Sequence, residues 1–298
     1  MAVYSINDIE QLSGVKAHTI RMWEKRFDII KAKRTVSNIR YFDDEDLKLI
    51  LNIALLNRNG FKISKIAKMN SEEIKLKVAE SLDVESAFDD KLDVLMLAMF
   101  ELNEYKFTKI LEHQIKENGL ENTLDDMIYP LLDKLSMMWL TGSVKSVHES
   151  FVSNIIKRKL IIESDKLAFS DIENSTKALI FLPENDTHEL SLLYLHFLLK
   201  KHGAIALNLG IQTPLIDVLE AKEIFQPQYI FTIFNDSFED KPLQPYLDDM
   251  VKYAKDCKIV ISGYQTIRQK ITLPPGMIHL PNLTDLKTFI FKEIAVNQ

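Results

Sequence analysis

The chain has 298 residues, of which 46% are hydrophobic and 27% are charged, and its formal net charge is -6. This composition is typical of a soluble globular protein with about two or three domains. Its single cysteine, Cys257, excludes a disulfide framework and a cysteine-based zinc site. No apolar run reaches the roughly 18 residues of a membrane helix, and the first residues lack a signal-peptide pattern, so we expect a cytoplasmic protein.

Charge is distributed unevenly along the chain. Residues 1–80 contain 15 Lys and Arg against 11 Asp and Glu, whereas the remainder contains 22 against 32. Within residues 16–42, eight basic residues stand against two acidic ones. A basic segment on an acidic chain indicates a polyanionic partner, with a solvated helix face as the alternative. We therefore expect only the N-terminal part to contact nucleic acid.

The first elements have the pattern of a helix-turn-helix. Ser5 can cap a helix, with Asp8 in the reciprocal position, and Ser13-Gly14 predicts a tight turn after that helix. A second, basic helix is predicted over about 16–26. Two short helices joined by a turn that contains glycine are typical of DNA-binding domains when the second helix is basic.

An extended basic segment follows at 33–42. The turn formers Ser37-Asn38 divide it into two arms, which predicts a β-wing that contacts phosphates. Acidic residues at 43–46 begin the next predicted helix, and Asn59-Gly60 ends it. The predicted DNA-contacting residues lie on the second helix and the wing: Lys16, His18, Thr19, Arg21, Arg26, Lys33, Arg34, Asn38, Arg40 and Tyr41.

Residues 3–75 closely resemble the DNA-binding domain of MerR-type transcription regulators. The matching segments are SINDIEQLSGV, TIRMWEKRF, the KR and IRYF arms of the wing, and the helices DEDLKLI and LLNRNGFKISKIA. Ala32 stands where the family usually has proline, and Asn38 where it often has glycine. Such regulators usually act as dimers on inverted repeats, often through a long coiled coil. Residues 71–82 are too few for one, so the resemblance implies a homo-oligomer, dimer or higher, formed through the later domains.

Residues 84–166 contain no β-rich run. Their apolar residues recur at spacings of three and four, which predicts a bundle of about four or five helices. Asn118-Gly119 and Thr141-Gly142 mark turns between these helices.

One segment of this bundle resembles the helical cap of cobalamin-binding modules, whose pattern is W-x2-G-x6-E-H. Trp139, Gly142 and Glu149 match this pattern, and Ser150 replaces the histidine. His148 lies one residue early, on a different helix face. Light-sensing members also have histidine directly after the tryptophan, where this chain has leucine, so photochemistry of their kind is not expected.

From residue 176 onward, apolar runs alternate with helical patterns. Strands are predicted at 177–182, 204–210, 229–234 and 258–262, and helices at 189–201, 214–225, 243–256 and 285–294. This alternation predicts a flavodoxin-like doubly wound parallel sheet, in which ligands bind beyond the carboxyl ends of the strands. The whole chain is therefore predicted to be an α/β multidomain protein, with a winged helix-turn-helix (1–80), a helical bundle (84–166) and a sheet domain (175–298).

A histidine follows the first predicted strand. An isolated histidine at a helix start is ordinarily a capping or surface residue. The pattern D-x-H-x-x-G at this place, however, marks cobalamin-binding domains, in which the histidine can be the lower axial ligand of cobalt. A carboxylate two residues earlier can orient its other nitrogen. Asp186 and His188 match, and Ser191 replaces the glycine.

Two further loops resemble the same family. LNLGIQTPL places Gly210 and Thr213, and Ser262-Gly263 stands where the family has a Gly-Gly pair close to the nucleotide tail of the cofactor. The bulky Tyr264 would partly fill the tail slot if it pointed inward. The resemblance implies cofactor contacts by Trp139, Glu149, Asp186, His188, Ser191, Gly210, Thr213, Ser262 and Gly263, with His188 as the cobalt ligand.

Three functions compete on these patterns. The first is a transcriptional regulator whose C-terminal module binds a corrinoid, cobalamin, and thereby controls oligomerisation or DNA binding. The second is a regulator whose module is a ligand-free oligomerisation or partner-binding platform, with Tyr264 packed into the vacant slot. The third is an enzyme such as a corrinoid methyl carrier. The DNA-binding head argues against the third, as does the lack of a nucleophile–base pair or phosphate loop in the sequence.

Overall fold

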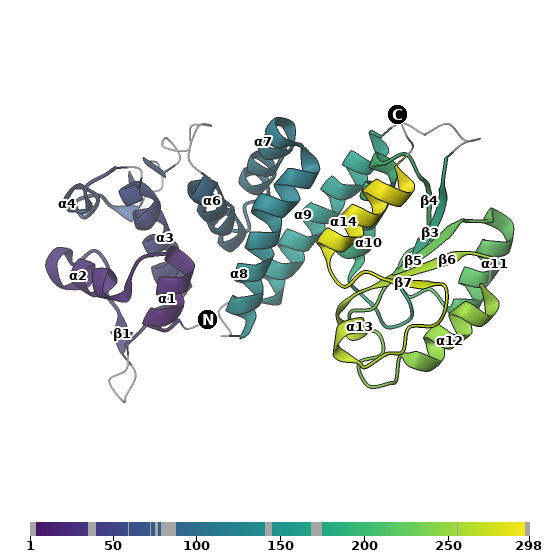
Figure 1. Ribbon diagram of the computed structural model, residues 1–298. Coiled ribbons are helices and arrows are strands. Elements are labelled where there is room, and N and C mark those ends of the chain that lie inside the picture. Colours follow the sequence, from purple (N-terminus) through teal and green to yellow (C-terminus); the bar gives the residue numbers. More distant parts are fainter. Residues whose placement is uncertain are drawn as a thin grey trace. The chain divides into compact units, whose positions relative to one another are not determined.

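The computed structural model describes residues 4–34, 40–58, 60–71, 73–74, 77–78, 88–140, 145–167, 175–254 and 256–295. The chain divides into two compact units, Met1–Ile155 and Ile156–Gln298. The first unit holds the N-terminal head and a set of helices, and the second holds a parallel sheet with its covering helices (Figure 1). Among the described residues, none of the helices combines the length and apolar character needed to cross a membrane.

The head is a winged helix-turn-helix. Its elements are α1 (Ile6–Ser13), α2 (Ala17–Phe27), β1 (Lys33–Arg34), β2 (Arg40–Tyr41), α3 (Asp44–Arg58) and α4 (Ile63–Ile66). The predicted reciprocal cap of α1 is present, because the Asp8 amide donates to Ser5 Oγ at 3.2 Å and the Ser5 amide donates to Asp8 Oδ2 at 2.7 Å. Gly14 ends α1 with a left-handed φ of 68°. Ile20 and Trp23 of α2 are buried, so the apolar stripe of that helix lies in the core.

The base of the wing is an antiparallel pair of short strands. Lys33 lies opposite Tyr41, and Arg34 lies opposite Arg40. An isolated bridge between Tyr4 and Phe42 continues this pairing. The wing turn at 35–39, with its predicted contact residue Asn38, lies outside the described residues.

The remaining helices of the first unit agree with the predicted bundle. They are α6 (Phe88–Phe100), α7 (Glu104–Thr123), the π-helix η1 (Leu124–Ile128), α8 (Tyr129–Leu140) and α9 (Ser146–Asp165), whose last ten residues belong to the second unit. The turn predicted at Asn118-Gly119 is a break inside α7, where Gly119 has φ 77° and ψ 163°. The turn predicted at Thr141-Gly142 lies outside the described residues.

Helix α3 connects the head to the bundle by contacts at both of its ends. It packs against α6. At its C-terminal end, Arg58 forms an ion pair with the buried carboxylate of Asp93 on α6. At its N-terminal end, Asp44 lies 3.0 Å from Nζ of Lys145, directly before α9. His148 is buried nearby, with its ring edge-on to Phe100 at 5.4 Å.

The second unit is a doubly wound parallel sheet, as predicted. Its strands are β3 (Lys177–Phe181), β4 (Ile205–Asn208), β5 (Tyr229–Ile233), β6 (Lys258–Ser262) and β7 (Met277–His279), in the order β4-β3-β5-β6-β7. Its helices are α10 (Glu189–Lys201), α11 (Leu215–Phe225), α12 (Gln244–Tyr253), α13 (Tyr264–Arg268), α14 (Leu283–Phe289) and the π-helix η2 (Ile290–Ile294). This strand order is the flavodoxin-like one.

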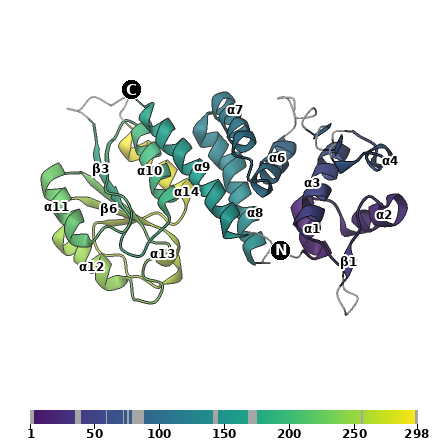
Figure 2. The same ribbon diagram turned by 180° about the vertical axis from the view of Figure 1, so that it is seen from behind.

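Helices cover both faces of this sheet. Helices α10 and α14 lie on one face, and α11 and α12 lie on the other (Figures 1 and 2). On the first face, the Phe289 ring meets Tyr229 and Phe231 edge-on, at 5.8 and 6.2 Å. On the second face, Leu247 and Met250 of α12 belong to the core cluster that contains Ile230 of β5. Both faces of β5 are therefore buried, which explains its continuous apolar run.

Two elements of this unit were not predicted. The strand β7 has only three residues and follows a Pro-Pro-Gly segment. An alternating pattern this short cannot be recognised in the sequence. Helix α13 has five residues and begins directly after Gly263. Both follow β6 along the chain, and α13 borders the candidate site described below.

Candidate functional site

Half of the predicted DNA-contacting residues lie on α2 or at its N-cap. Lys16, His18, Arg21 and Arg26 are exposed, and Thr19 is half-buried. Lys16, His18 and Thr19 lie at the N-terminal end of α2, from which a recognition helix usually contacts base edges, whereas Arg26 lies in its last turn. Four of these five residues are thus accessible to solvent.

Several of these cations are paired with acids in the protein itself. Lys16 Nζ lies 3.0 Å from Glu10 Oε1, and the other Glu10 oxygen accepts the Ala17 amide at 2.9 Å. Arg40 Nε lies 3.2 Å from Glu24 Oε2, which joins the wing to α2. Exposed pairs of this kind contribute little stability, so a phosphate can displace the acid.

At the wing base, Lys33 contacts two carboxylates. It pairs with Asp43 and lies 3.3 Å from Asp46. The Lys33 hydrogen bond lowers the pKa of Asp43 to about 2. Arg34 on the same strand is exposed, and Tyr41 opposite Lys33 is half-buried. At the base of the wing, Arg34 is therefore the more exposed of these two side chains, and Lys33 is engaged by acids.

A second group of predicted residues gathers at the carboxyl ends of β3, β4 and β6. Asp186 and His188 follow β3, and Gly210 and Thr213 follow β4. A bridge between Pro183 and Thr213 holds these two loops together. Gly210 has φ 89°, and buried Thr213 has its hydroxyl 3.4 Å from the Gly210 carbonyl, so both shape this loop.

Asp186 is the buried centre of this group. Its Oδ2 accepts the backbone amides of Asn235, Asp236 and Ser237 at 2.7, 3.1 and 3.4 Å, and the Ser237 hydroxyl at 3.1 Å. Burial alone would raise the pKa of this carboxyl, but hydrogen bonds from His188 and from these amides lower the pKa of Asp186 to about 2. One carboxylate thus fixes the loop after β5.

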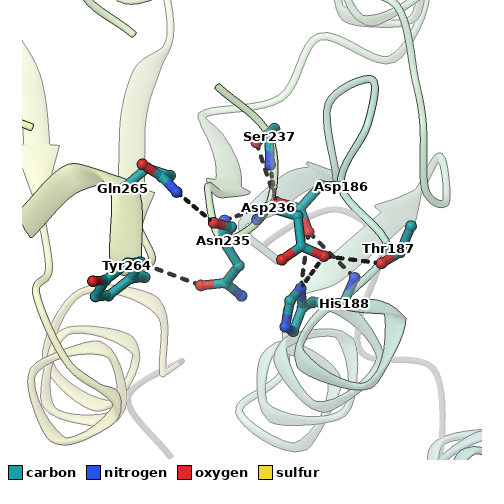
Figure 3. Close-up of polar contacts among 8 residues, drawn as sticks. All are labelled: Asp186, Thr187, His188, Asn235, Asp236, Ser237, Tyr264 and Gln265. Carbon is teal, nitrogen blue, oxygen red and sulfur yellow. Dashed lines mark hydrogen bonds and ion pairs between the residues drawn. The ribbon is translucent and has the colours of Figure 1, made fainter. Parts of the chain in front are cut away.

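His188 lies at the start of α10 with its ring half-exposed. Its Nδ1 is 3.0 Å from Asp236 Oδ2 and 3.5 Å from Asp186 Oδ1, so both carboxylates approach the same ring nitrogen (Figure 3). The hydrogen bond with Asp186 and the charge of Asp236 raise the pKa of His188, while burial opposes them. The neutral ring with its proton on Nδ1 leaves a lone pair on Nε2, which suits a metal ligand.

The loop after β6 joins the same network through Asn235. The Tyr264 amide donates to Asn235 Oδ1 at 3.1 Å, and Gln265 Nε2 donates to the Asn235 carbonyl at 3.0 Å (Figure 3). Gly263 has φ 105°, and a Cβ there would lie 2.5 Å from the Phe234 carbonyl oxygen. Glycine is therefore required for the loop after β6 to pass the end of β5.

Two serines that stand where the family pattern has glycine, Ser262 and Ser191, form hydrogen bonds in the structure. The Ser262 hydroxyl donates to the Leu280 carbonyl at 2.6 Å. Ser191 lies in the first turn of α10, where its amide donates to the His188 carbonyl at 3.0 Å. The Tyr264 side chain is 61% exposed, so it does not pack into a slot of the core.

The predicted cap residues belong to the first unit. Glu149 is exposed on α9. Trp139 is in α8, but its side chain lies outside the described part of the structure, as does Gly142. His148 is buried against Phe100.

The sequence did not single out Thr187, Asn235, Asp236 or Ser237. Thr187 Oγ1 donates to Asp236 Oδ2 at 3.0 Å, which makes Asp236 a shared acceptor. The available signal was a run of three polar residues, Asn235 to Ser237, directly after the strand 229–234. Polar residues in that position lie at the ligand-binding edge of such sheets.

Residues 4–73 match the sequence model of the family described as MerR HTH family regulatory protein. The head is a MerR-type helix-turn-helix domain. The predicted resemblance of this region is confirmed.

Relatives extend the similarity beyond the head. The chain is 22% identical over 245 residues to the HTH-type transcriptional repressor CarH of Myxococcus xanthus, over 80% of this chain and 81% of that protein. It is 23% identical over 260 residues to the HTH-type transcriptional repressor CarA of the same organism, over 87% of this chain and 85% of that one. The chain is thus similar to transcriptional regulators over most of its length.

A solved structure supports the fold of the later part. The monomethylamine corrinoid protein of Methanosarcina barkeri aligns with a TM-score of 0.51 and 11% identity, over 69% of this chain and 99% of that chain. At this identity the likeness shows the fold alone. The MerR-type head is therefore followed by an α/β fold like that of this corrinoid protein, and the predicted fold class is confirmed.

Proposed function

We propose that this MerR-type regulator binds double-stranded DNA through residues 1–80 and a corrinoid through its sheet domain, 175–298, with 84–166 as the cap. Corrinoid binding then controls oligomerisation or DNA binding in the cytoplasm. The observation that carries the proposal is His188, which is held through Nδ1 at the carboxyl end of β3 on a corrinoid-protein fold. The similarity to CarH and CarA supports the regulatory half.

The residues present suit a cobalamin. Imidazole is a suitable ligand for cobalt, which the corrinoid would supply, and His188 offers a half-exposed ring with its other nitrogen hydrogen-bonded to a carboxylate. Gly210 and Thr213 shape the adjacent loop, and Gly263 allows close backbone approach at the next one. The proposed contacts of Trp139 and Glu149 come from the family resemblance.

One observation weighs against the ligand-free alternative. It had Tyr264 packed into a vacant tail slot, whereas the Tyr264 side chain is 61% exposed. The alternative still predicts a platform whose assembly ignores corrinoids, so the two proposals differ in a measurable way.

The ligand half is tested by the visible spectrum. Purified protein is mixed with adenosylcobalamin or methylcobalamin and desalted, and the retained absorbance is recorded. We expect retained corrinoid, and a His188→Ala variant that lacks the spectral signature of histidine ligation. His202→Ala, at the opposite end of α10, is the matched control. Absence of retained corrinoid would refute the ligand half, and an unchanged spectrum in His188→Ala would exclude this histidine as the ligand.

The regulatory half is tested by assembly and DNA binding. A ligand shifts an equilibrium between oligomers only by its different affinity for them. Light scattering with and without corrinoid should therefore show a change in mass, or DNA-binding titrations should show a change in affinity. If neither quantity changes while corrinoid is retained, the corrinoid does not regulate the protein, and the platform alternative is favoured.

A further inference from the structure

Two carboxylates compete for one proton of His188. Nδ1 lies 3.0 Å from Asp236 Oδ2 and 3.5 Å from Asp186 Oδ1. The first distance is that of an ordinary hydrogen bond, and the second is at the limit for one. In the protonated ring both charges are favourable, but the neutral ring has a single Nδ1 proton to donate, and the nearer acceptor is Asp236.

Asp186 already accepts hydrogen bonds from several other donors. Its Oδ2 accepts three amides and the Ser237 hydroxyl, and its Oδ1 accepts the His188 amide at 3.2 Å. This carboxylate is fully buried. Its hydrogen bonds therefore build the loop from Asn235 to Ser237, and that loop in turn carries Asp236.

Asp236 is fixed at its place by two contacts. Its backbone amide donates to Asp186, and its Oδ2 accepts the Thr187 hydroxyl at 3.0 Å. The Asp236 and His188 side chains are each 47% exposed, so the pair lies at the solvent edge of the network. Figure 3 shows Asp236 between Thr187 and the His188 ring.

We propose that Asp236 is the positioning residue of His188. It holds the neutral imidazole with the proton on Nδ1 and Nε2 free to bind a metal, and Asp186 acts one step further back by building the loop that presents Asp236. This inference rests on the proposed function only for the identity of the ligand that Nε2 binds. It assigns to Asp236 the orienting role that the sequence pattern gave to Asp186.

The same side chains resemble a small metal site, because their ligand atoms lie within 4.8 Å of one another. Because Asp186 already accepts hydrogen bonds from backbone amides, we interpret the three side chains as a hydrogen-bonded network and not as a metal site. All samples in the test are therefore treated with a chelator, so that a divalent ion does not bind to Nδ1.

The first test uses the protein without corrinoid. The chain has 7 histidines, so 15N-histidine labelling gives a spectrum in which His188→Ala assigns the His188 signals. In the neutral ring we expect the Nδ1-protonated tautomer, whereas free histidine favours the Nε2-protonated one. Asp236→Ala should shift His188 toward the free-histidine tautomer. Asp240→Ala removes an exposed carboxylate from the same loop and should change nothing.

Two further variants separate the roles of the carboxylates. Thr187→Val should shift the tautomer partly, because Asp236 loses its second contact. Asp186→Asn should lower the melting temperature, whereas Asp236→Ala should leave it near that of the wild type. A tautomer shift in Asp186→Asn without one in Asp236→Ala would overturn the proposal, and so would a wild-type ring with its proton on Nε2.

The second test uses bound corrinoid. If Asp236 orients His188, Asp236→Ala should weaken histidine ligation by about 10- to 100-fold in corrinoid affinity, the range for lost partners of metal-binding histidines. Its spectrum should lose the histidine-ligated signature, and Asp240→Ala should keep it. Should the wild type retain no corrinoid, the ligand half of the proposed function fails, while the tautomer measurement still decides the role of Asp236.

Discussion

The head and the loop around His188 both place charged side chains beside opposite charges, but the two regions differ in depth. In the head, Arg40 pairs with Glu24 and Lys16 with Glu10 at the surface. In the loop, the fully buried carboxylate of Asp186 accepts its donors away from water. Surface pairs are exchanged easily for a phosphate, whereas a buried carboxylate cannot lose its donors without a large cost. A phosphate can therefore replace the acids in the ion pairs of the head, whereas the hydrogen bonds of the loop are expected to persist.

The largest effect is expected at the buried carboxylate. Asp186→Asn should lower the free energy of unfolding by about 2 kcal/mol, because a neutral amide cannot accept the same charge-assisted hydrogen bonds. Urea unfolding followed by far-UV circular dichroism measures this change. Asp240→Asn is the matched control, and equal unfolding midpoints for both variants would contradict the comparison.

The contribution of Asp186 to stability should also depend on pH. The pKa of Asp186 is lowered from 3.8 to about 2, so its contribution to stability is complete above about pH 4 and is lost as the pH falls toward 2. The unfolding free energy of the wild type should fall over this interval more steeply than that of Asp186→Asn. Parallel curves for the two proteins would show that Asp186 is not the group involved.

A smaller effect is expected on the proposed DNA-binding face. Arg21 is exposed on α2, so Arg21→Ala should weaken DNA binding by about 1–3 kcal/mol if it reaches a base edge, and relax the sequence preference at that position. Fluorescence anisotropy with operator and unrelated DNA measures both quantities. Lys270→Ala, which removes one exposed positive charge from the second unit, controls for net charge. Equal losses on both DNAs would make Arg21 a phosphate contact instead.

The smallest effects are expected at the Arg40–Glu24 pair, with opposite signs. Arg40→Ala should weaken binding to all DNA sequences and reduce the salt slope by about 1. Glu24→Gln should tighten binding by roughly twofold to fivefold, since it frees Arg40 and removes a negative charge. Anisotropy titrations over a range of salt concentrations give both values. Weaker binding by Glu24→Gln would mean that the pair holds Arg40 in its DNA-bound position.

The sequence predicted those features that depend on local patterns. The cap at Ser5, the break at Gly119 and the alternation of strands and helices all follow from neighbouring residues. It also placed Asp186 and His188 at the carboxyl end of the first strand of the sheet. These features involve residues a few positions apart, so their physical causes are visible in a short window.

The partners of His188 were harder to predict. Asp236 lies 50 residues after Asp186, and the two meet only because β5 is hydrogen-bonded to β3 in the sheet. The Arg40–Glu24 pair similarly depends on how the wing folds against α2. Contacts of this kind require the strand order and loop geometry, which no periodicity in the sequence specifies.

The two contacts of α3 have a consequence for how DNA is read. Arg58 pairs with Asp93 at one end of this helix, and Asp44 pairs with Lys145 at the other. The winged helix-turn-helix therefore contacts the bundle at two points of α3, in addition to the packing of α3 against α6. If two copies bind an inverted repeat as a dimer, the number of base pairs between the half-sites depends on how the dimer places the two heads. Binding affinities for a series of operators with altered spacers would thus report how far apart the two heads lie in such a dimer.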